Sequence, residues 1–542
     1  MVRVKAGIEI LAQSVVSRFH PFHPHPTRGH LLPREKASSR SRLTKGSGFV
    51  APLWGQWALV PAWQSHYPAG VMPLPVITVE QMRRWEAATW ESGKTEEEVI
   101  AQVGVVVANR AMELTRSGDA ILLLAGKGHN GDDVRAMAGH LPEREVSLLS
   151  VTDPAKTRQK LPLDLDPAPA LVIDGLFGIG LNRPLDADWM QVIAQINAKR
   201  LRVLSIDVPS GIDAATGEVQ GAAIRAEETL TLGAAKLGLL KPSASEFVGR
   251  LRVARDIGLT PCLETSDLLL GQTEDFVGFP PARPAGGHKG TFGHLGIMAG
   301  SVGYHGAAVL AAHGAARAQP GLITLLTPDE VFVPVASQLQ GVMVKPLVPG
   351  EITIHSITGL LIGPGLAADD LPADLKETTG EMWRESSVPM VVDASALDWL
   401  PSGGLPDKAI RVITPHPGEA ARLLNSSADA VQTDRVEALR ALSAKFGGCW
   451  VVLKGQHTLI GHGEGEVFVN PTGNPALGQG GSGDLLAGYL AGLLAQPLLR
   501  EDVGRTIRYA AWQHGAAADE LASQAPNWVV EDLAKRIGAV QA

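Results

Sequence analysis

A glycine-rich stretch directly before an apolar segment is the part of this sequence best suited to chemistry. Residues 473–484 are rich in glycine and lead into the apolar run 485–499. Such a turn at a helix start directs several backbone N–H groups, and the positive end of the helix dipole, toward one point, which suits a phosphate or a developing anion. Asp484 lies in the first turn, where a carboxylate would repel phosphate. We therefore expect Asp484 to accept a proton from a hydroxyl that attacks the phosphate; the alternative is a simple helix cap.

Composition favours a large α/β protein. The chain has 542 residues, more than one hydrophobic core usually supports, so we expect two or three domains. Its net charge of −8 argues against a nucleic-acid partner. The apolar run 485–499 is too short to span a bilayer, which argues against a membrane partner. The two cysteines, Cys262 and Cys449, are too few for a disulfide framework and indicate a reducing compartment, the cytoplasm.

Residues 1–71 differ in composition from the rest of the chain. They hold nine Lys or Arg residues against two acidic ones, and a His/Pro run at 20–26. Because such a segment cannot easily bury a core, we expect it to be disordered. Its composition also resembles a transit peptide or a His-rich metal tract. The interpretation we prefer is a misassigned start, with Met72 as the true first residue.

Polar side chains follow three successive predicted strands in the first half, residues 72–265. The strand at 120–125 leads into a glycine-rich loop with Asn130 and Asp133, the strand at 171–173 ends at Asp174, and the strand at 202–206 ends at Asp207. Ligands of open α/β sheets bind at the carboxyl ends of the strands. Each residue could instead cap a helix. Together they predict a doubly wound sheet with a ligand site at this edge.

The second half, residues 276–542, repeats the same pattern. Short apolar strands are expected at 322–326, 360–362, 390–392, 411–414 and 450–453, each followed by a polar or glycine-rich loop. This alternation predicts a second doubly wound α/β domain. Residues 263–274 lack an apolar period and are expected to be a linker between the halves. His305, His313 and His514 are expected to be structural.

The first half resembles the NAD(P)H-hydrate epimerase family. The motifs that carry this resemblance are the loop from Gly126, the Asp-Gly-Leu-Phe-Gly loop from Asp174, and the segments 206–211 and 231–240. The resemblance implies a Rossmann-like domain that interconverts the R and S epimers of hydrated NADH and NADPH (NADHX and NADPHX). It also implies a potassium site formed by Asn130, Asp174 and Ser210. The hydrate would be held by Asp207 and two loops, His129, Asn130, Gly131, Asp132, Asp133 and Gly178, Ile179, Gly180, Leu181, Asn182, Arg183, Pro184.

Asp207 is suited to catalyse this epimerisation. The reaction can proceed by loss of the hydroxyl, pushed by the ring nitrogen, and re-addition from the other face. A carboxylate can shuttle the proton and stabilise the cationic intermediate. The family usually reads Asn-Asn-Gly-Gly-Asp where this chain has His129 and Asp132 in the first and fourth positions. A catalytically inactive first half therefore stays an alternative.

The second half resembles the ribokinase-like superfamily and, within it, the ADP- or ATP-dependent NAD(P)H-hydrate dehydratase family. The specific motifs are residues 289–294, 363–365, 414–419 and the Asn-Pro before the glycines. The resemblance implies hydrate contacts from Ala307, Gly365, His416 and Asp484. It implies nucleotide contacts from Lys454, Gly455, Gln456, His457, Thr458 and Gly483. Ser395 replaces an acidic residue common in the family, so Asp393 is the carboxylate left in that loop.

The two resemblances together predict one repair enzyme with two activities. Asp484 would activate the hydrate hydroxyl for attack on ADP, with magnesium assisting, and loss of phosphate would restore NAD(P)H. The runner-up is a ribokinase-like small-molecule kinase, which would not need the first half. We expect NADHX, NADPHX and ADP as small-molecule partners, and we also expect a homo-oligomer.

Overall fold

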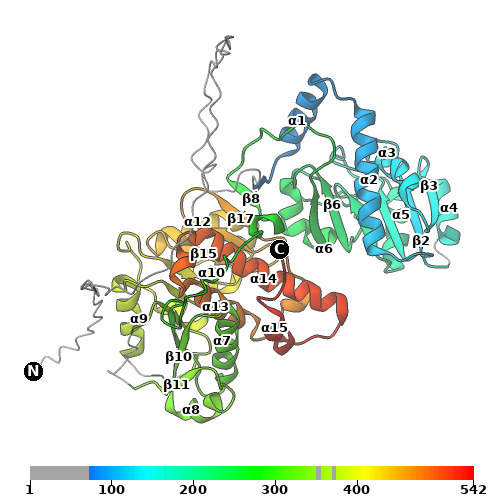
Figure 1. Cartoon of the computed structure of the whole chain (residues 1–542). Helices are drawn as coiled ribbons and strands as arrows, with labels where there is room; N and C mark the ends of the chain where they lie inside the picture. Colours follow the sequence, from blue (N-terminus) through cyan, green and yellow to red (C-terminus); the bar gives the residue numbers. More distant parts are fainter. Residues whose placement is uncertain (1–72, 165–166, 349–355, 369–370, 372–373) are drawn as a thin grey trace, which may run out of the picture. The chain divides into compact units, whose positions relative to one another are not determined.

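The computed structural model describes residues 73–164, 167–348, 356–368, 371 and 374–542 (Figure 1). The predictions for residues 1–71 lie outside the described residues. Residues Pro73–Ala542 form one compact unit. No helix in the described ranges is long and apolar enough to cross a membrane.

A six-stranded parallel sheet forms from the first half of the chain. Its order is β3-β2-β4-β5-β6-β7, and every neighbouring pair is parallel. The strands are β2 (Ala120–Ala125), β3 (Glu145–Ser150), β4 (Leu171–Gly175), β5 (Val203–Ile206), β6 (Glu228–Leu232) and β7 (Arg250–Ala254). Since β2, β4 and β5 are parallel neighbours, the polar residues that follow them meet at one edge.

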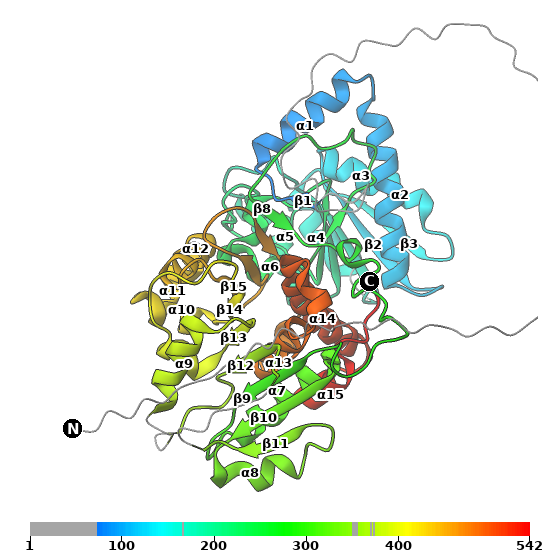
Figure 2. The ribbon, with the colours of Figure 1, turned by 60° about the vertical axis from the view of Figure 1, so that its left-hand side comes forward.

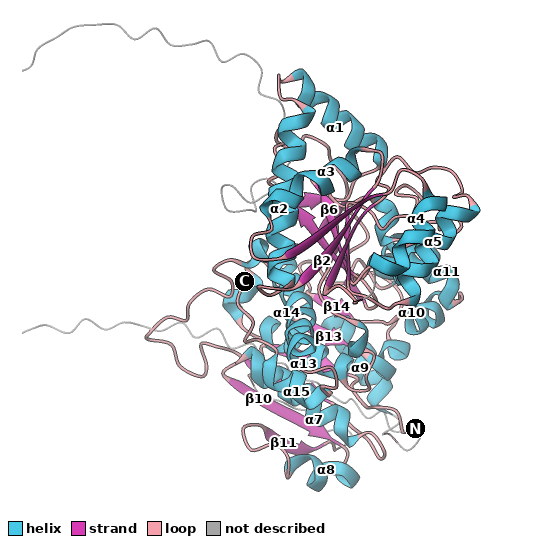
Figure 3. Cartoon of the chain, turned by 90° about the vertical axis from the view of Figure 1, so that its right-hand side faces the viewer, coloured by secondary structure: helices cyan, strands magenta, loops and turns pink. Residues whose placement is uncertain are grey.

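Helices cover both faces of this sheet, as the predicted doubly wound fold requires. Figure 3 shows α2 (Glu96–Leu114) and α3 (His129–Met137) on one face, and α4 (Pro154–Asp164) and α5 (Ala187–Ala198) on the other. Successive residues of β2 point to opposite faces: Ile121 belongs to the cluster with α2, and Leu122 to the cluster with α5. The preceding helix α1 (Val79–Glu91) begins with a capping box of Thr78 and Gln81.

One local expectation is wrong in this half. Residues 129–133 were expected to be loop, but they form the first turn of α3, with Gly128 as its N-cap. The amides of Gly131 and Asp132 donate to the carbonyl of Gly128. A helix start satisfies these N–H groups within the backbone, and it turns Asn130 and Asp133 inward.

An eleven-stranded sheet forms mainly from the second half. Its order is β1-β8-β17-β16-β15-β14-β13-β12-β9-β10-β11, with parallel pairing from β15 through β11. The strands are β1 (Leu74–Pro75), β8 (Leu268–Leu270), β9 (His294–Met298), β10 (Leu322–Thr327), β11 (Met343–Pro346), β12 (Gly359–Ile362), β13 (Met390–Val392), β14 (Arg411–Ile413), β15 (Trp450–Leu453), β16 (Leu459–Gly461) and β17 (Val467–Val469). The mixed α/β fold with parallel sheets confirms the predicted fold class.

This sheet is also covered on both faces. Figure 2 shows α9 (Asp374–Glu385), α10 (Pro417–Leu424) and α12 (Arg435–Lys445) on one side of the strands, and α7 (His305–Ala318), α13 (Ser482–Leu494) and α14 (Val503–Gln524) on the other. The two buried clusters follow the same division. The remaining helices are α6 (Ser245–Val248), α8 (Asp329–Ala336), α11 (Ala428–Thr433) and α15 (Val530–Arg536).

The expected linker at 263–274 contains a strand, so that expectation is wrong for β8. Leu268, Leu269 and Leu270 are buried, and β8 pairs with both β17 and β1. Burial of three leucines and the pairing of their backbone groups favour a strand despite the missing period. As a result, residues at both ends of the first half belong to the second sheet.

Helices α7 and α13 approach so closely that their contact depends on glycine. A Cβ on Gly488 would lie 1.9 Å from the carbonyl oxygen of Ala311, and one on Gly314 would lie 2.1 Å from that of Leu485. This contact fixes the start of α13, where Asp484 lies in the first turn. The helix ends at Leu494, before Pro497, and so is shorter than the apolar run that predicts it.

We predict that Gly488→Ala lowers the thermal unfolding midpoint, because the new methyl group forces α7 and α13 apart at a cost of about 1–3 kcal/mol. Differential scanning calorimetry measures the shift. Gly306→Ala is the matched control, since it adds a methyl group in α7 where no atom lies within 4 Å. Equal midpoints for the wild type and Gly488→Ala would contradict the close approach.

Candidate functional site

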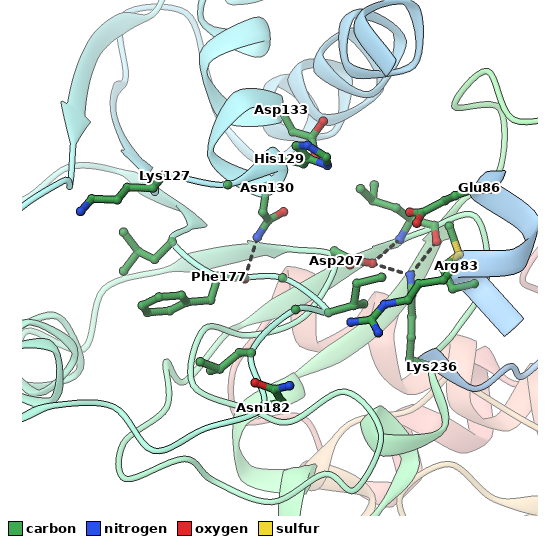
Figure 4. A pocket seen from close by; sticks show the side chains of 18 of the residues that line it. Arg83, Glu86, Lys127, His129, Asn130, Asp133, Phe177, Asn182, Asp207 and Lys236 are labelled. Carbon is green, nitrogen blue, oxygen red and sulfur yellow. Dashed lines mark hydrogen bonds and ion pairs between the residues drawn. The ribbon is translucent and has the colours of Figure 1, made fainter. Parts of the chain in front are cut away.

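A cavity of about 990 Å³ opens at the carboxyl edge of the first sheet (Figure 4). Its wall contains most of the residues that the sequence singles out, namely His129, Asn130, Asp133, Gly178, Ile179, Gly180, Leu181, Asn182, Arg183, Pro184 and Asp207. Gly131 and Asp132 are not part of this wall. A Cβ on Gly131 would lie 2.2 Å from the carbonyl oxygen of Gly126, and Asp132 forms an ion pair with Arg135 at 2.8 Å.

A buried ion pair lies at the centre of this cavity. Lys236 Nζ donates to Asp207 Oδ1 at 2.5 Å, and it also donates to the carbonyl of Leu232 and to Thr231 Oγ1. The lysine side chain has no exposed surface, and that of Asp207 is 10% exposed. Asp207 has a left-handed backbone, with φ of 64°. These hydrogen bonds hold Asp207 in that strained conformation and fix the direction in which its carboxylate points.

Two further carboxyl groups face the same cavity. Burial, with the nearby charge of Asp207, raises the pKa of Asp133 to about 8. The same two causes raise the pKa of Glu86, which enters from α1. Asp133 is therefore protonated at neutral pH. The cavity combines a proton donor with an oriented Asp207 carboxylate.

The residues of the predicted potassium site gather at the cavity wall, where Asn130 lines the cavity and Asp174 and Ser210 lie outside the lining. Asp174 is completely buried and accepts from Ser205 Oγ at 2.8 Å and from the amide and hydroxyl of Ser210 at 2.9 and 2.6 Å. Burial raises the pKa of Asp174. Asn130 donates its amide hydrogens to the carbonyls of Phe177 and Ile206, and its Oδ1 is buried without a hydrogen-bond partner. The cluster thus has several oxygens and one unsatisfied acceptor.

A second cavity, of about 1390 Å³, lies beside the glycine-rich stretch. Its wall contains His416, Gly483 and the predicted nucleotide loop, Lys454, Gly455, Gln456, His457 and Thr458. The wall does not include Asp484, Ala307 or Gly365. Ala307 and Gly365 lie together, since a Cβ on Gly365 would be 2.8 Å from that of Ala307.

Charged groups from three parallel strand ends meet at Lys454. Its Nζ lies 2.9 Å from Asp393 Oδ1, which follows β13, and 3.8 Å from Glu419 Oε2 in α10, which follows β14. Burial alone would lower the pKa of Lys454, but these two carboxylates raise it overall. Burial and the charge of Asp393 raise the pKa of Asp484 to about 6. Asp484 can therefore gain or lose a proton close to neutral pH.

The glycine-rich stretch leads into a helix start, as the sequence predicts; anion binding there stays a prediction. Gly481 has φ of 92° and precedes α13, whose first residues are Ser482 and Gly483. Gly483 has no side chain to separate the helix start from Lys454, whose Nζ would lie 3.3 Å from a Cβ there. His514 Nε2 lies 3.0 Å from the carbonyl of Ser482, and burial lowers its pKa to about 4. The neutral ring thus contacts the first turn of α13, in agreement with the structural role expected for His514.

His416, whose side chain is 56% exposed, presents one ring nitrogen to the backbone, and its other nitrogen, Nε2, lies 3.6 Å from Glu419 Oε1. Its Nδ1 accepts from the amides of Gly418 and Glu419 at 3.0 and 3.3 Å, and Glu419 Oε2 accepts from the amide of His416 at 2.8 Å. This capping box begins α10. Because Nδ1 is an acceptor, the proton of a neutral ring is on Nε2, where it can be donated to a ligand.

The sequence alone does not identify several charged residues of the first cavity. Arg83, Glu86, Lys127 and Lys236 line it. Lys236 lies within the segment 231–240 that carries the family resemblance, so its position was a usable signal. Glu86 follows the buried Met82 by four residues on α1 and so shares its inward face. Lys127 likewise lies in the loop from Gly126 that carries the resemblance, whereas Arg83 has no comparable signal.

Two family models match separate segments of the chain. Residues 149–238 match the model described as YjeF-related protein N-terminus, and residues 295–539 match the model described as NAD(P)H-hydrate dehydratase. The bifunctional NAD(P)H-hydrate repair enzyme Nnr of Gloeobacter violaceus is 33% identical over 84% of this chain and 95% of its own. The enzyme of the same name from Coxiella burnetii is 33% identical over 82% and 94%. A solved ADP/ATP-dependent NAD(P)H-hydrate dehydratase from Bacillus subtilis is 28% identical over 49% of this chain and 95% of that chain, with a TM-score of 0.44.

We predict that Asp133→Asn becomes more stable relative to the wild type as pH rises from about 4 to about 8. The folded Asp133 holds its proton up to about pH 8, whereas an unfolded aspartate loses it near pH 4, so the wild type loses stability through this window. The expected relative gain is roughly 1 kcal/mol or more. Thermal midpoints at pH 5 and pH 8 measure it. Asp213→Asn, at a side chain that is not among the charges acting on Asp133, is the control.

Proposed function

Because the chain belongs to the family of bifunctional NAD(P)H-hydrate repair enzymes, we propose that its first half interconverts R- and S-NAD(P)HX. In the same proposal, the second half dehydrates the S form to NAD(P)H and converts ADP to AMP and phosphate. The observation that carries the proposal is that one chain holds two strand-end cavities, each with a lysine in its wall that pairs with an aspartate, Lys236 with Asp207 and Lys454 with Asp393. One cavity combines carboxyl groups around Asp207, and the other combines a glycine-rich helix start with Lys454.

In the first site, two carboxyl groups have different roles. Asp133, protonated at neutral pH, donates a proton to the departing hydroxyl of the hydrate. The carboxylate of Asp207, held by Lys236, faces the cationic nicotinamide ring that remains and stabilises its charge. Water then adds from the other face and returns the proton to Asp133. Each turnover leaves both side chains as they were, as an epimerase requires.

Potassium fits the oxygens behind this site. The ligands proposed for it are Asn130, Asp174 and Ser210, all of which offer the oxygen donors that hard cations take. The buried Oδ1 of Asn130 has no partner in the described part of the chain, and a cation there would satisfy it. Bound potassium would add a positive charge beside the hydrate pocket.

In the second site, Asp484 acts as the base. It takes the proton of the hydrate hydroxyl as that oxygen attacks the terminal phosphate of ADP. The amides at the start of α13 and the ammonium of Lys454 balance the charge that develops on the phosphate. AMP leaves first. Phosphate then leaves from the ring carbon as the ring nitrogen donates its electron pair. Loss of a proton from the neighbouring ring carbon restores NAD(P)H.

Magnesium would reach this site with the nucleotide. Within the described ranges, no group of three or more His, Cys, Asp or Glu residues could hold a metal ion alone. Magnesium commonly binds through substrate phosphates and one or two carboxylates, and Asp393 and Glu419 are the carboxylates beside Lys454. ADP is the proposed phosphoryl donor. We further propose a homo-oligomer in the cytoplasm, where the free thiols of Cys262 and Cys449 would stay reduced.

We predict that Asp207→Ala slows epimer exchange by about 10²–10⁴-fold, because the cationic intermediate loses its oriented carboxylate. Dehydration of pure S-NADHX with ADP should be unchanged. With mixed epimers and ADP, the wild type should recover all NADH absorbance and the variant only the S fraction. Asp213→Asn, in a neighbouring turn where Asp213 accepts from the amides of Ala215 and Thr216, is the control. Full recovery by Asp207→Ala would remove Asp207 from the mechanism.

We predict that Asp484→Asn stops ADP-dependent recovery of NADH, with a loss of at least about 10²-fold, because no base remains for the hydroxyl. In the wild type, kcat/KM for dehydration should fall as pH decreases through about 6, where Asp484 becomes protonated. Epimer exchange, followed by chromatography, should persist in the variant and shows that it is folded. Unchanged turnover by Asp484→Asn would exclude it as the base.

A further inference from the structure

One arginine collects the carbonyl groups of the loop that we assign to the nucleotide. Arg435 is the first residue of α12. Its Nη2 donates to the carbonyls of Leu453 and Lys454 at 3.1 and 3.3 Å. Its Nη1 donates to the carbonyl of His457 at 3.2 Å and to that of Gln456. Four carbonyls of residues 453–457 thus point at a single guanidinium group.

The remaining carbonyl of this segment is also occupied. The Oγ1 of Thr458 donates to the carbonyl of Gly455 at 3.1 Å. Every carbonyl between 453 and 457 therefore has a side-chain donor. The loop itself has an unusual backbone: Gly455 has φ of 139° and His457 has φ of 52°. Glycine adopts such a conformation readily, whereas for His457 it persists only where surrounding contacts enforce it.

The direction of the carbonyls determines the direction of the amides. In a trans peptide, the C=O of one residue and the N–H of the next point to opposite sides. Because the carbonyls of Lys454, Gln456 and His457 point at Arg435, the N–H groups of Gly455, His457 and Thr458 point away from it. These residues line the second cavity. Consecutive outward N–H groups form a concave surface that attracts anions.

The charge of Arg435 has no acidic partner in the part of the chain that the structure describes. Its contacts are neutral carbonyls, and its buried Nε has no hydrogen-bond partner. Burial lowers its pKa to about 10, and no carboxylate raises it again. Arginine stays protonated at that value. The loop therefore has an uncompensated positive charge on the side opposite the cavity.

We propose that Arg435 is the positioning residue of the nucleotide site: it fixes the loop 454–458 so that its amides face the phosphates of a nucleoside diphosphate. This inference rests on the proposed function, because it takes ADP as the ligand of that loop. Arg435 itself lies outside the cavity wall, so it acts through the loop rather than on the reacting atoms.

A second arginine of α12 provides a matched control. Arg440 donates to the carbonyls of Gly463 and Gly465 at 3.2 and 3.0 Å, and to Asp267 at 2.7 Å. It holds the turn between β16 and β17, which does not line the cavity. Both arginines thus hold a loop by its carbonyls, and only one of these loops belongs to the proposed site.

The test is steady-state dehydration of S-NADHX with varied ADP, for wild type, Arg435→Gln, Arg435→Lys and Arg440→Gln. For Arg435→Gln we expect the KM for ADP to rise about tenfold or more, with kcat changed less than about threefold and epimer exchange unchanged. Arg435→Lys should restore little, because an ammonium cannot span four carbonyls as a planar guanidinium does. Arg440→Gln should keep the wild-type KM. A KM within about twofold of the wild type in folded Arg435→Gln overturns the inference.

Hydrogen exchange on the wild type tests the same inference without a variant. ADP should protect the amides of residues 455–458 and leave those of 462–466 unchanged, and lack of protection at 455–458 overturns the inference. The two proposals fail in distinguishable ways. If the wild type does not recover NADH yet ADP protects the loop, the proposed function fails and the assigned loop stands. If the wild type is active and the Arg435 variants match it, only the inference fails.

Discussion

A lysine with little or no exposed surface, paired with an aspartate at the end of a parallel strand, is the interaction on which both sites depend. Lys236 pairs with Asp207 in the first half, and Lys454 pairs with Asp393 in the second. Removing such an ion from water costs several kcal/mol unless a partner and further hydrogen bonds compensate it. The same contacts therefore hold both the lysine and the backbone around it in place. Both pairs contribute to the electrostatics of their sites: burial, with the added charge of Asp207, raises the pKa of Asp133, and burial, with the added charge of Asp393, raises that of Asp484.

Parallel sheet geometry brings these pairs together. The strands β12, β13, β14 and β15 are consecutive parallel neighbours, so the loops after them meet along one edge. The backbones of two of these loops also approach closely. A Cβ on Gly363, after β12, would lie 1.8 Å from the carbonyl oxygen of Asp393, after β13. Glycine at that position allows the two strand ends to touch, and Asp393 is thereby placed beside Lys454.

The two halves are connected by strand pairing, a common buried cluster and an ion pair, in addition to the linking segment. Strands β1 and β8 come from the two ends of the first half and pair in the second sheet. One buried cluster contains Val208 and Leu239 together with Leu268. Arg250 Nη2, in β7, lies 3.0 Å from Asp519 Oδ1, and Asp519 accepts from the amide of Gly473, where the glycine-rich stretch begins. The two sites are therefore parts of one folded unit, Pro73–Ala542.

The α/β class, most strands and the two glycine-rich sites could be predicted from the sequence, because short apolar runs ending in Asp, Asn or Gly have a local signature. The boundaries of the two halves, the extension at 1–71 and the individual ligand contacts stay predictions. Three features needed the tertiary structure: the strand β8, the pairing of Lys236 with Asp207, and the hold of Arg435 on the loop 454–458. The two side-chain contacts have no local pattern, and the three leucines of β8 are too short a run to be assigned without their partner strands. Each depends on residues about 20 to 200 positions apart along the chain. For Lys236 and Arg435, only the packing of the folded chain decides which carbonyl or carboxylate the long cationic side chain contacts.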